Sequence, residues 1–356
     1  SLNNKLNVNE EYMEAFRTKS YIDLCSKVQG QMRRTSIDKL SSSSSLPLYV
    51  HLSDFLLEPR QETLMDMLKS LNVHHLLVDY FQASLEACDV CELLLQSIHK
   101  TRASHRKIRR VIKLSKRMDN CASSTDDEEY CSAILSELGG FALLKNPLSN
   151  ITPVKFREIH DTNMLLFHKL TLKRKKIRRR VKFNRICNKI GRYSLVISHG
   201  ALAIALLVIA LHCMVGLVAA PGLVACSLSI LFKKKIKLVG VGAKTRLLES
   251  LDAQLDIAAK GIFILINDFD TISRLVRGLY DEIEHRKAVA NMCIRNKGSE
   301  VVKEVAKEFH LHESSFLEQL EELEENIYLC FHTMNRSRRL VIQHILVAQQ
   351  WSSLES

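Results

Sequence analysis

The sequence has 356 residues, with 51 Lys and Arg against 39 Asp and Glu and a formal net charge of +12. Five prolines and twelve glycines are few for this length, and the ten cysteines are scattered. Composition therefore favours an α-rich chain and excludes a compact disulfide framework. Three stretches without acids (99–117, 173–192 and 233–246) hold 26 of the basic residues, and the rest of the chain is net acidic. This distribution is more typical of a membrane protein than of a uniformly basic nucleic-acid-binding protein.

The first 50 residues are predicted to form short amphipathic helices and a linker. Polar and apolar residues are interleaved over 7–32, and five consecutive serines occupy 41–45. Serine-rich runs of this kind behave as flexible linkers. The sequence therefore predicts a separate N-terminal region, 1–50, before the main helical body.

Residues 51–192 are predicted to be a helical region with basic runs. Apolar residues at 3-4 spacing indicate a long helix that begins near Pro59 and continues into the first basic run. The polar, acidic stretch 119–132 reads as a loop. A second helix is expected from about Pro153 into the basic block at 173–192.

Residues 193–232 contain no Asp, Glu, Lys or Arg and are predicted to be a transmembrane or re-entrant hairpin. A helix needs about 20 apolar residues to cross a bilayer, so this stretch allows two crossings. Pro221 and Gly222 give the strongest turn signal, and a turn near His212 is the alternative. Basic residues on both flanks favour a hairpin with both termini in the cytoplasm over a single span. The plasma membrane is one candidate for the membrane. The remaining alternative is a hairpin buried in a soluble bundle.

The flanking cations are assigned to anionic lipid headgroups, because basic residues beside an apolar segment meet the negatively charged cytoplasmic leaflet. The assigned residues are Lys173, Arg174, Lys175, Lys176, Arg178, Arg179, Arg180, Lys182, Arg185, Lys233, Lys234, Lys235 and Lys237. The alternative for such a charge run is a solvated helix face or a nuclear localisation signal.

Residues 233–350 are predicted to fold as an antiparallel helical hairpin. Two rows of apolar residues alternate three and four apart, which is the spacing of a helix-packing seam, and a polar break near Gly298 separates them. The first seam is Leu248, Leu251, Leu255, Ala258, Ile262, Leu265, Phe269, Ile272, Val276, Leu279 and Ile283. The second is Phe316, Leu320, Leu323, Ile327, Cys330, Met334, Val341 and Ile345, with Arg338 as its one polar member.

Motifs that would carry chemistry are not recognised in the sequence. Cys88 and Cys91 form a lone CxxC on a predicted helix, without a partner pair at zinc-site spacing. The stretch 239–244 has glycines but lacks the GxxxxGK[ST] pattern of a phosphate loop. We therefore expect no enzyme activity, no metal, no cofactor and no small-molecule substrate.

Several stretches resemble the integrin-related, fourteen-a-like proteins of land plants, uncharacterised protein family 0496. They include "LVDYFQASLEACDVC" from Leu77, "AAPG" from Ala219, and "LESLDAQLDIAAKGIFILINDFDTISRLVRGLYDEIEHRK" from Leu248, which is the most specific. The resemblance covers most of the chain. It implies a helical, membrane-associated protein with no assigned enzymatic activity, in a family connected with membrane–cytoskeleton continuity and stress responses.

Together these features predict an all-α fold, a long-helix bundle with coiled-coil-like packing and a hydrophobic transmembrane hairpin. The predicted function is that of a membrane-anchored helical interaction or scaffold protein. Its expected partners are anionic lipids and other proteins that bind its helical surfaces, and nucleic acid is not expected. The alternative is a soluble helical nuclear protein that binds nucleic acid through its basic runs.

Overall fold

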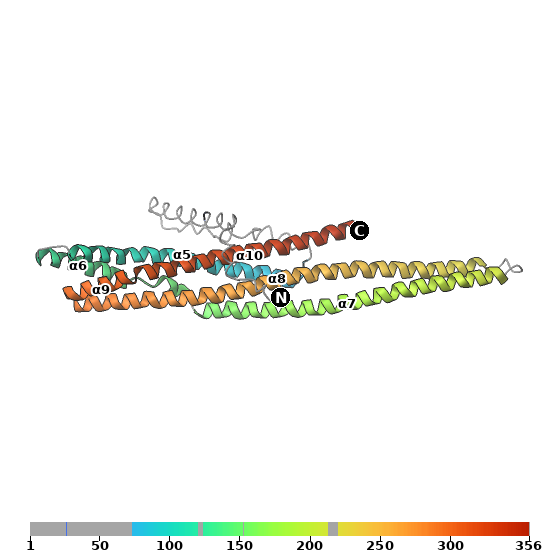
Figure 1. Ribbon diagram of the computed structural model, residues 1–356, viewed down its shortest axis with the longest axis horizontal. Helices are drawn as coiled ribbons and strands as arrows, with labels where there is room; N and C mark the ends of the chain where they lie inside the picture. Colours follow the sequence, from blue (N-terminus) through green and yellow to red (C-terminus); the bar gives the residue numbers. More distant parts are fainter. Residues whose placement is uncertain (1–25, 27–72, 120–123, 152, 213–219, 356) are drawn as a thin grey trace, which may run out of the picture. The chain divides into compact units, whose positions relative to one another are not determined.

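The computed structural model describes Ser26 and residues 73–119, 124–151, 153–212 and 220–355. Side chains are described for only a few of the residues between 191 and 243. The elements in the described part, which contains no strand, are α5 (His75–Met118), α6 (Ser124–Ala142), η1 (Pro147–Asn150), α7 (Pro153–His212), α8 (Ala220–Asn296), α9 (Ser299–Leu311) and α10 (Glu313–Glu355) (Figure 1). The predicted all-α class is confirmed. The predicted N-terminal helices and Ser-rich linker lie outside the described residues, apart from Ser26, which is helical.

Helix α5 begins at a side-chain cap and then buries a broad face. His74 precedes its first turn, and the Nδ1 atom of this residue accepts a hydrogen bond from the amide of Leu76 at 3.2 Å. Lys116 and Arg117 lie in the last turn, where cations interact favourably with the helix dipole. The helix continues through the first basic run, as predicted, and ends at Met118.

Helix α6 replaces part of the predicted loop at 119–132. It begins at Ser124, so the acidic residues 126–129 lie in its first two turns. Carboxylates are favourable near a helix N-terminus, because the backbone dipole is positive there. The acidic cluster therefore starts a helix here, and the prediction that it forms a loop to residue 132 is wrong.

The predicted multi-pass membrane hairpin is contradicted. No helix in the described part of the chain is both long enough and apolar enough to cross a bilayer. The apolar stretch is divided between the end of α7 and the start of α8, and each of these helices continues into a strongly charged segment. Pro221 and Gly222, predicted at the turn, lie in the first turn of α8, a position where proline is well tolerated because the first amides of a helix have no intrahelical acceptor. Residues 213–219, between the two helices, lie outside the described residues.

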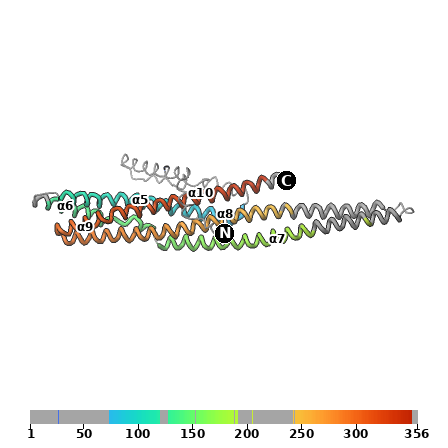
Figure 2. The backbone as a smooth tube through the Cα atoms, in the orientation of Figure 1, coloured from blue at the N-terminus to red at the C-terminus, as the bar shows by residue number. Residues whose placement is uncertain are grey.

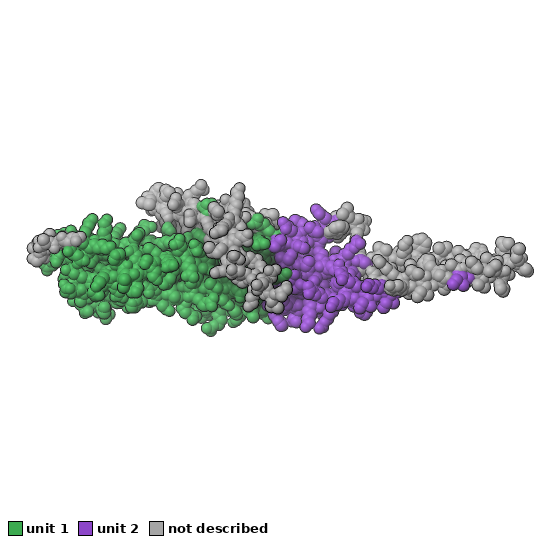
Figure 3. Space-filling model, viewed as in Figure 1, with its two compact units in different colours: residues 1–166, 260–339 green, residues 167–259, 340–356 purple. Residues whose placement is uncertain are grey.

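Two compact units are built from segments far apart in the sequence. Unit 1 contains the residues up to Leu166 and Lys260–Arg339, and unit 2 contains Phe167–Ala259 and Leu340–Ser356 (Figure 3). The long helices α7, α8 and α10, whose backbone Figure 2 traces, each contribute residues to both units. The units are described separately below.

The C-terminal seams contribute to the cores of both units: the apolar members within 262–283 and 316–334 lie in unit 1, and the remaining apolar members lie in unit 2. Leu255 and all later members of the first seam are buried, as are all members of the second, whereas Leu248 and Leu251 are half-buried. The predicted break is confirmed: α8 ends at Asn296, and Gly298 caps α9. The predicted direct connection between the two seam helices is wrong, because a separate helix, α9, follows α8 and precedes α10 in the chain.

Contacts between α8 and α10 in unit 1 show that the two helices run antiparallel. The Thr333 hydroxyl donates to Asp268 Oδ2 at 3.0 Å, and the guanidinium carbon of Arg286 lies 4.1 Å from the centroid of the Phe316 ring. At Gly261 an added Cβ would collide with the Ser337 hydroxyl, so only glycine permits this close approach of α8 and α10. From pair to pair, a higher residue number on α8 goes with a lower residue number on α10, as expected for antiparallel helices.

Arg338, the one polar member of the second seam, is fully buried in unit 1. Its Nη1 atom donates to the Phe81 carbonyl at 3.3 Å and to the Ser84 hydroxyl, and its guanidinium lies over the Phe81 ring. These contacts join α10 to α5. A buried charge is tolerated when it has such partners, so the polar member belongs to the packing.

A second cluster of buried apolar side chains lies at the end of unit 1 where α9 packs. It joins α5, α6, α8 and α9, with Ile108, Leu138, Cys293 and Val305 among its members. The apolar residues of the first basic run therefore belong to a core, although cations surround them in the sequence.

Candidate interaction surface on α7

The basic block of α7 lies on a helix with a buried inner seam in unit 2. Leu170, Ile177 and Val181 are buried, and Arg174 takes the intervening position of the 3-4 pattern. The inner face of α7 is therefore a packing surface of the same kind as the C-terminal seams. The basic residues around it are arranged by this packing.

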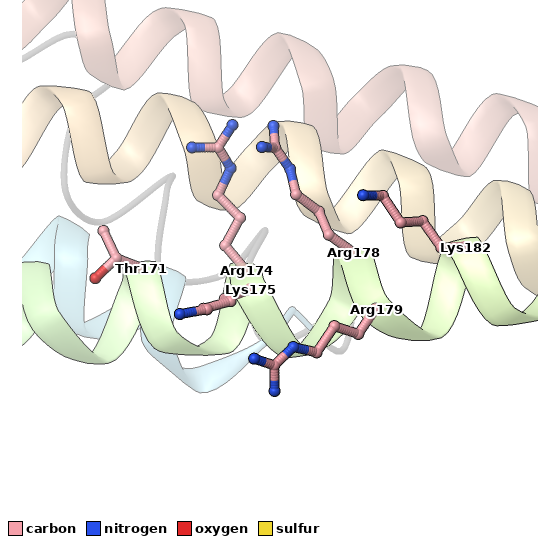
Figure 4. Close-up of a pocket in the computed structure, with 6 residues that line it drawn as sticks. All are labelled: Thr171, Arg174, Lys175, Arg178, Arg179 and Lys182. Atoms are coloured by element: carbon pink, nitrogen blue, oxygen red, sulfur yellow. The ribbon is translucent and has the colours of Figure 1, made fainter.

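Three arginines of the block are paired with carboxylates of α8 in unit 2. Arg174 contacts Asp256, and its Nε atom lies 3.5 Å from Asp252 Oδ1. The Nε of Arg178 donates to Asp252 Oδ2 at 3.0 Å, and Arg185 donates from two nitrogens to Glu249 Oε1 at 3.1 and 2.9 Å. In Figure 4 the side chains of Arg174 and Arg178 extend toward the neighbouring helix. The exposed pairs of Arg178 and Arg185 contribute at most about 1 kcal/mol each, whereas the pairs of Arg174 are partly buried, and all of them fix the register of α7 against α8.

The other cations of the block have no ion pair among the described residues. Those with described side chains are Lys173, Lys175, Lys176, Arg179, Arg180, Lys182 and Lys189. A shallow groove of about 340 Å³ runs along this side of α7, lined by Thr171, Arg174, Lys175, Arg178, Arg179 and Lys182. Lys175 and Arg179 extend away from the side to which Arg174 and Arg178 extend (Figure 4). The block therefore has an inner set of cations that α8 neutralises and an outer set that it leaves in solvent.

An apolar row runs along the outer face of α7, opposite the inner seam. Leu172 is 53% exposed, Phe183 67%, Ile186 56% and Ile190 62%. The positions 172, 179, 183, 186 and 190 are spaced seven, four, three and four residues apart, which places them on one side of an α-helix. Arg179 is the one cation in this row. We call these five residues the outer stripe.

The outer stripe is the feature that the sequence analysis missed. The density of charge in the basic block predicts a solvated helix face, and the apolar residues between the charges are too widely spaced to stand out as a run. Two interleaved 3-4 patterns, one through Ile177 and Val181 and one through Phe183 and Ile186, are visible in the sequence once both are sought. The acidic partners on α8 were also missed, because nothing local in the sequence pairs residue 174 with residue 252.

The structure leaves the other predicted lipid contacts undescribed. The side chains of Lys233, Lys234, Lys235 and Lys237 lie outside the described residues, although their backbone belongs to α8.

The thiols of Cys88 and Cys91 are buried on α5. A side-chain hydrogen bond with Cys91 and burial raise the pKa of the Cys330 thiol well above its ordinary value, and burial does the same for the pKa of Cys88. Thiols with raised pKa values are poor nucleophiles, so Cys88 and Cys330 act as small core side chains.

Comparison with known proteins gives a family for this fold. The family model described as "Protein of unknown function (DUF677)" matches residues 17–345. UPF0496 protein At1g20180 of Arabidopsis thaliana is 50% identical over 97% of this chain and 92% of its own length. UPF0496 protein 2 of Oryza sativa subsp. indica is 31% identical over 94% of this chain and 89% of its own length. No solved structure matches the chain.

Proposed function

Because the chain belongs to the DUF677 (UPF0496) family of plant proteins, whose function is unknown, we propose a function from the α7 surface: this is a helical interaction protein that binds an acidic amphipathic helix of a partner protein. The observation that carries the proposal is the outer stripe, an exposed apolar row at helical spacing, beside cations that form no ion pair with the residues described. The proposal assigns binding and no chemical step.

The inner face of α7 supports a helix as the occupant of the outer face. There Leu170, Ile177 and Val181 are buried, and the neighbouring helix α8 presents carboxylates to Arg174 and Arg178 beside them. The outer stripe repeats this combination of apolar residues at 3-4 spacing with cations beside them. A partner helix with apolar residues at the same spacing and Asp or Glu on its flanks would complement it in the same way.

Charge favours an acidic partner over a second copy of this surface. Two α7 outer faces brought together would place Arg179 and its neighbouring lysines against like charges, which disfavours association. An anionic membrane would attract the same cations, but Arg179 in the middle of the row breaks the continuous apolar face that an interfacial helix inserts into lipid. Charge and apolar spacing therefore point to the same occupant.

The test is a binding titration of the full chain against three defined probes. The first is a designed helical peptide of about 20 residues with Leu at 3-4 spacing and Glu elsewhere. The second is vesicles of phosphatidylcholine with phosphatidylserine, and the third is duplex DNA. We expect the peptide to bind, and the triple change Phe183→Ser, Ile186→Ser, Ile190→Ser to weaken its binding by roughly tenfold or more, because burying these side chains supplies the apolar contribution.

Leu93→Ser is the matched control, since Leu93 is 40% exposed on α5. This change should leave peptide affinity unaltered. Stripe-dependent binding to vesicles without peptide binding would replace the protein partner by an anionic lipid surface. Selective binding to the duplex would favour the nucleic-acid alternative. If all three probes bind, the stripe variant binds them as tightly as the wild type, and added salt abolishes the binding, the attraction is purely electrostatic. That result would contradict the proposal.

A further inference from the structure

Unit 1 contains a second basic concavity, separate from α7. A hollow of about 480 Å³ lies between α5 and the segment that joins α6 to η1. Its lining residues are Lys100, Ala103, Ser104, Lys107, Leu144, Lys145, Asn146, Pro147 and Asn150. The α5 residues 100, 104 and 107 are spaced four and three apart, so they face the hollow from one side of the helix.

Three ammonium groups line the hollow, and the structure neutralises them only in part. Lys107 Nζ lies 3.6 Å from Glu137 Oε2, but Glu137 also accepts a hydrogen bond from Arg110 at 3.2 Å. Lys145 Nζ donates to the Asn150 side-chain oxygen at 3.4 Å, and no ion pair of Lys100 or Lys145 occurs within the described residues. Three like charges around one concavity repel each other, and a bound anion would relieve this repulsion.

The wall opposite α5 is held by buried hydrogen bonds. Asn146 is buried, and its side-chain amide donates to the Tyr280 carbonyl at 3.3 Å and to Glu284 Oε1 at 3.0 Å. Its side-chain oxygen accepts from the Leu148 amide at 3.1 Å. These bonds fix the backbone on both sides of Asn146, so Lys145 and Asn150 start from defined positions before any ligand binds. Preorganisation of this kind lowers the entropy cost of binding.

A glycine provides the space that Lys107 occupies. A Cβ added at Gly140 would lie 2.9 Å from Lys107 Nζ, with no other atom so close. A larger residue at position 140 would push the ammonium group aside. Because Nζ is the end of a flexible side chain, a side chain at position 140 would shift this charge rather than disturb the fold.

We propose that this hollow binds a phosphate monoester group. A phosphate dianion matches the excess of positive charge better than a single carboxylate, and its three terminal oxygens accept hydrogen bonds from the Lys100, Lys107 and Lys145 ammonium groups. The Ser104 hydroxyl is a further donor. The volume leaves room for the group that the phosphate carries. The ester belongs either to a soluble metabolite or to a lipid headgroup, and both sources present the same dianion.

Calorimetric titration of the full chain tests this site. The probes are inorganic phosphate, glycerol 3-phosphate, and vesicles that contain phosphatidic acid, whose headgroup is a phosphate monoester. Potassium chloride at matched ionic strength is the blank. We expect saturable binding of glycerol 3-phosphate, weakened roughly tenfold by each of Lys100→Gln, Lys107→Gln and Lys145→Gln, because each removes one charge-assisted hydrogen bond. Binding to phosphatidic acid vesicles alone would identify the lipid as the source of the phosphate.

Two further variants separate a built site from general attraction. Lys113→Gln removes an exposed lysine elsewhere on α5 and should leave binding unchanged. Gly140→Val keeps every charge but crowds Lys107, and should weaken binding while the helical circular dichroism spectrum is retained. The proposal is overturned if the wild type shows no saturable binding to any probe, if the triple lysine variant binds as the wild type does, or if Lys113→Gln weakens binding as much as Lys107→Gln.

Discussion

The basic runs of α5 and α7 have nearly the same composition but differ in where their apolar residues lie. In the α5 run, Ile108, Val111 and Ile112 are all buried. In the α7 run, Ile177 and Val181 are buried, but Phe183 and Ile186 are more than half exposed. Both runs leave some cations without an ion pair in the described part of the chain. The placement of apolar residues, and not the number of charges, therefore distinguishes a helix whose apolar residues are buried from a helix that leaves an apolar row exposed.

The two runs also differ in how their cations are arranged, and each arrangement suits a different kind of ligand. Around α5, Lys100, Lys107 and Lys145 converge on one hollow, which is a geometry for a small anion. Along α7, the cations extend beside an apolar row, which is a geometry for an extended partner. Convergent cations thus lead to the proposal of a phosphate site, and cations in a line lead to the proposal of a helical partner.

The largest expected difference between the runs is in stability. Ile108→Ala on α5 should lower the free energy of unfolding by about 2–4 kcal/mol, because it removes a fully buried side chain from the core that α5, α6, α8 and α9 share. Ile186→Ala on α7 makes the same chemical change at a side chain that is 56% exposed, and should cost less than about 0.5 kcal/mol. Urea unfolding followed by circular dichroism measures both. Equal losses would mean that the outer stripe is already packed in the free protein.

A smaller difference is expected within the α7 block itself. Arg174→Gln leaves Asp252 and Asp256 close together and partly buried without this counterion, and should cost about 1–2 kcal/mol. Arg179→Gln removes a solvent-exposed cation and should leave stability unchanged within about 0.5 kcal/mol. Thermal melting of the two variants makes the comparison. If Arg179→Gln is the more destabilising change, the division into inner and outer cations is wrong.

The smallest effect is a pH dependence that belongs to the α5 run. Burial, and then the positive charge of Arg286, lower the pKa of His105 from its ordinary value of 6.5, while Glu313 opposes the shift. The unfolded state therefore binds more protons than the folded state, so stability should fall as the pH drops below about 6.5 and through the lowered folded-state pKa. His105→Gln should reduce this slope. Melting temperatures of the wild type and of His105→Gln are measured between pH 7.5 and pH 5, a range that spans the unperturbed pKa of histidine. If the variant keeps the slope of the wild type, His105 is not the source of the pH dependence.

Periodicity in the sequence predicts much of this fold. The two C-terminal seams, including the polar Arg338, and the break near Gly298 are found where 3-4 spacing places them, because a sustained apolar row must be covered by another element. The sequence fails at 119–132, where acidic residues favour a helix start as much as a loop. It also fails at the apolar stretch 193–232, where composition predicts a membrane hairpin but no helix in the described part of the chain is long and apolar enough to cross a bilayer. The alternative turn position, His212, is the residue at which α7 ends.

The candidate sites depend on pairings that sequence order hides. The acids that neutralise Arg174 come from α8, and the hollow beside Lys107 is completed by Lys145 and Asn150 from the segment after α6. Each requires contact between residues about 40 to 80 positions apart, which one sequence without aligned relatives does not reveal. The outer stripe is different, since its spacing is local. Its four apolar residues are hidden only by the many Lys and Arg residues between them.

One comparison tests the central claim, that the outer stripe binds a partner helix through both its apolar residues and its cations. The full chain is titrated with two helical peptides of equal length and equal negative charge, one with Leu at 3-4 spacing and one with Ser in place of each Leu. The account predicts that the Leu peptide binds at least about tenfold more tightly, and that Phe183→Ser narrows this difference. Equal affinity for the two peptides would show that α7 attracts acids through charge alone and would contradict the account.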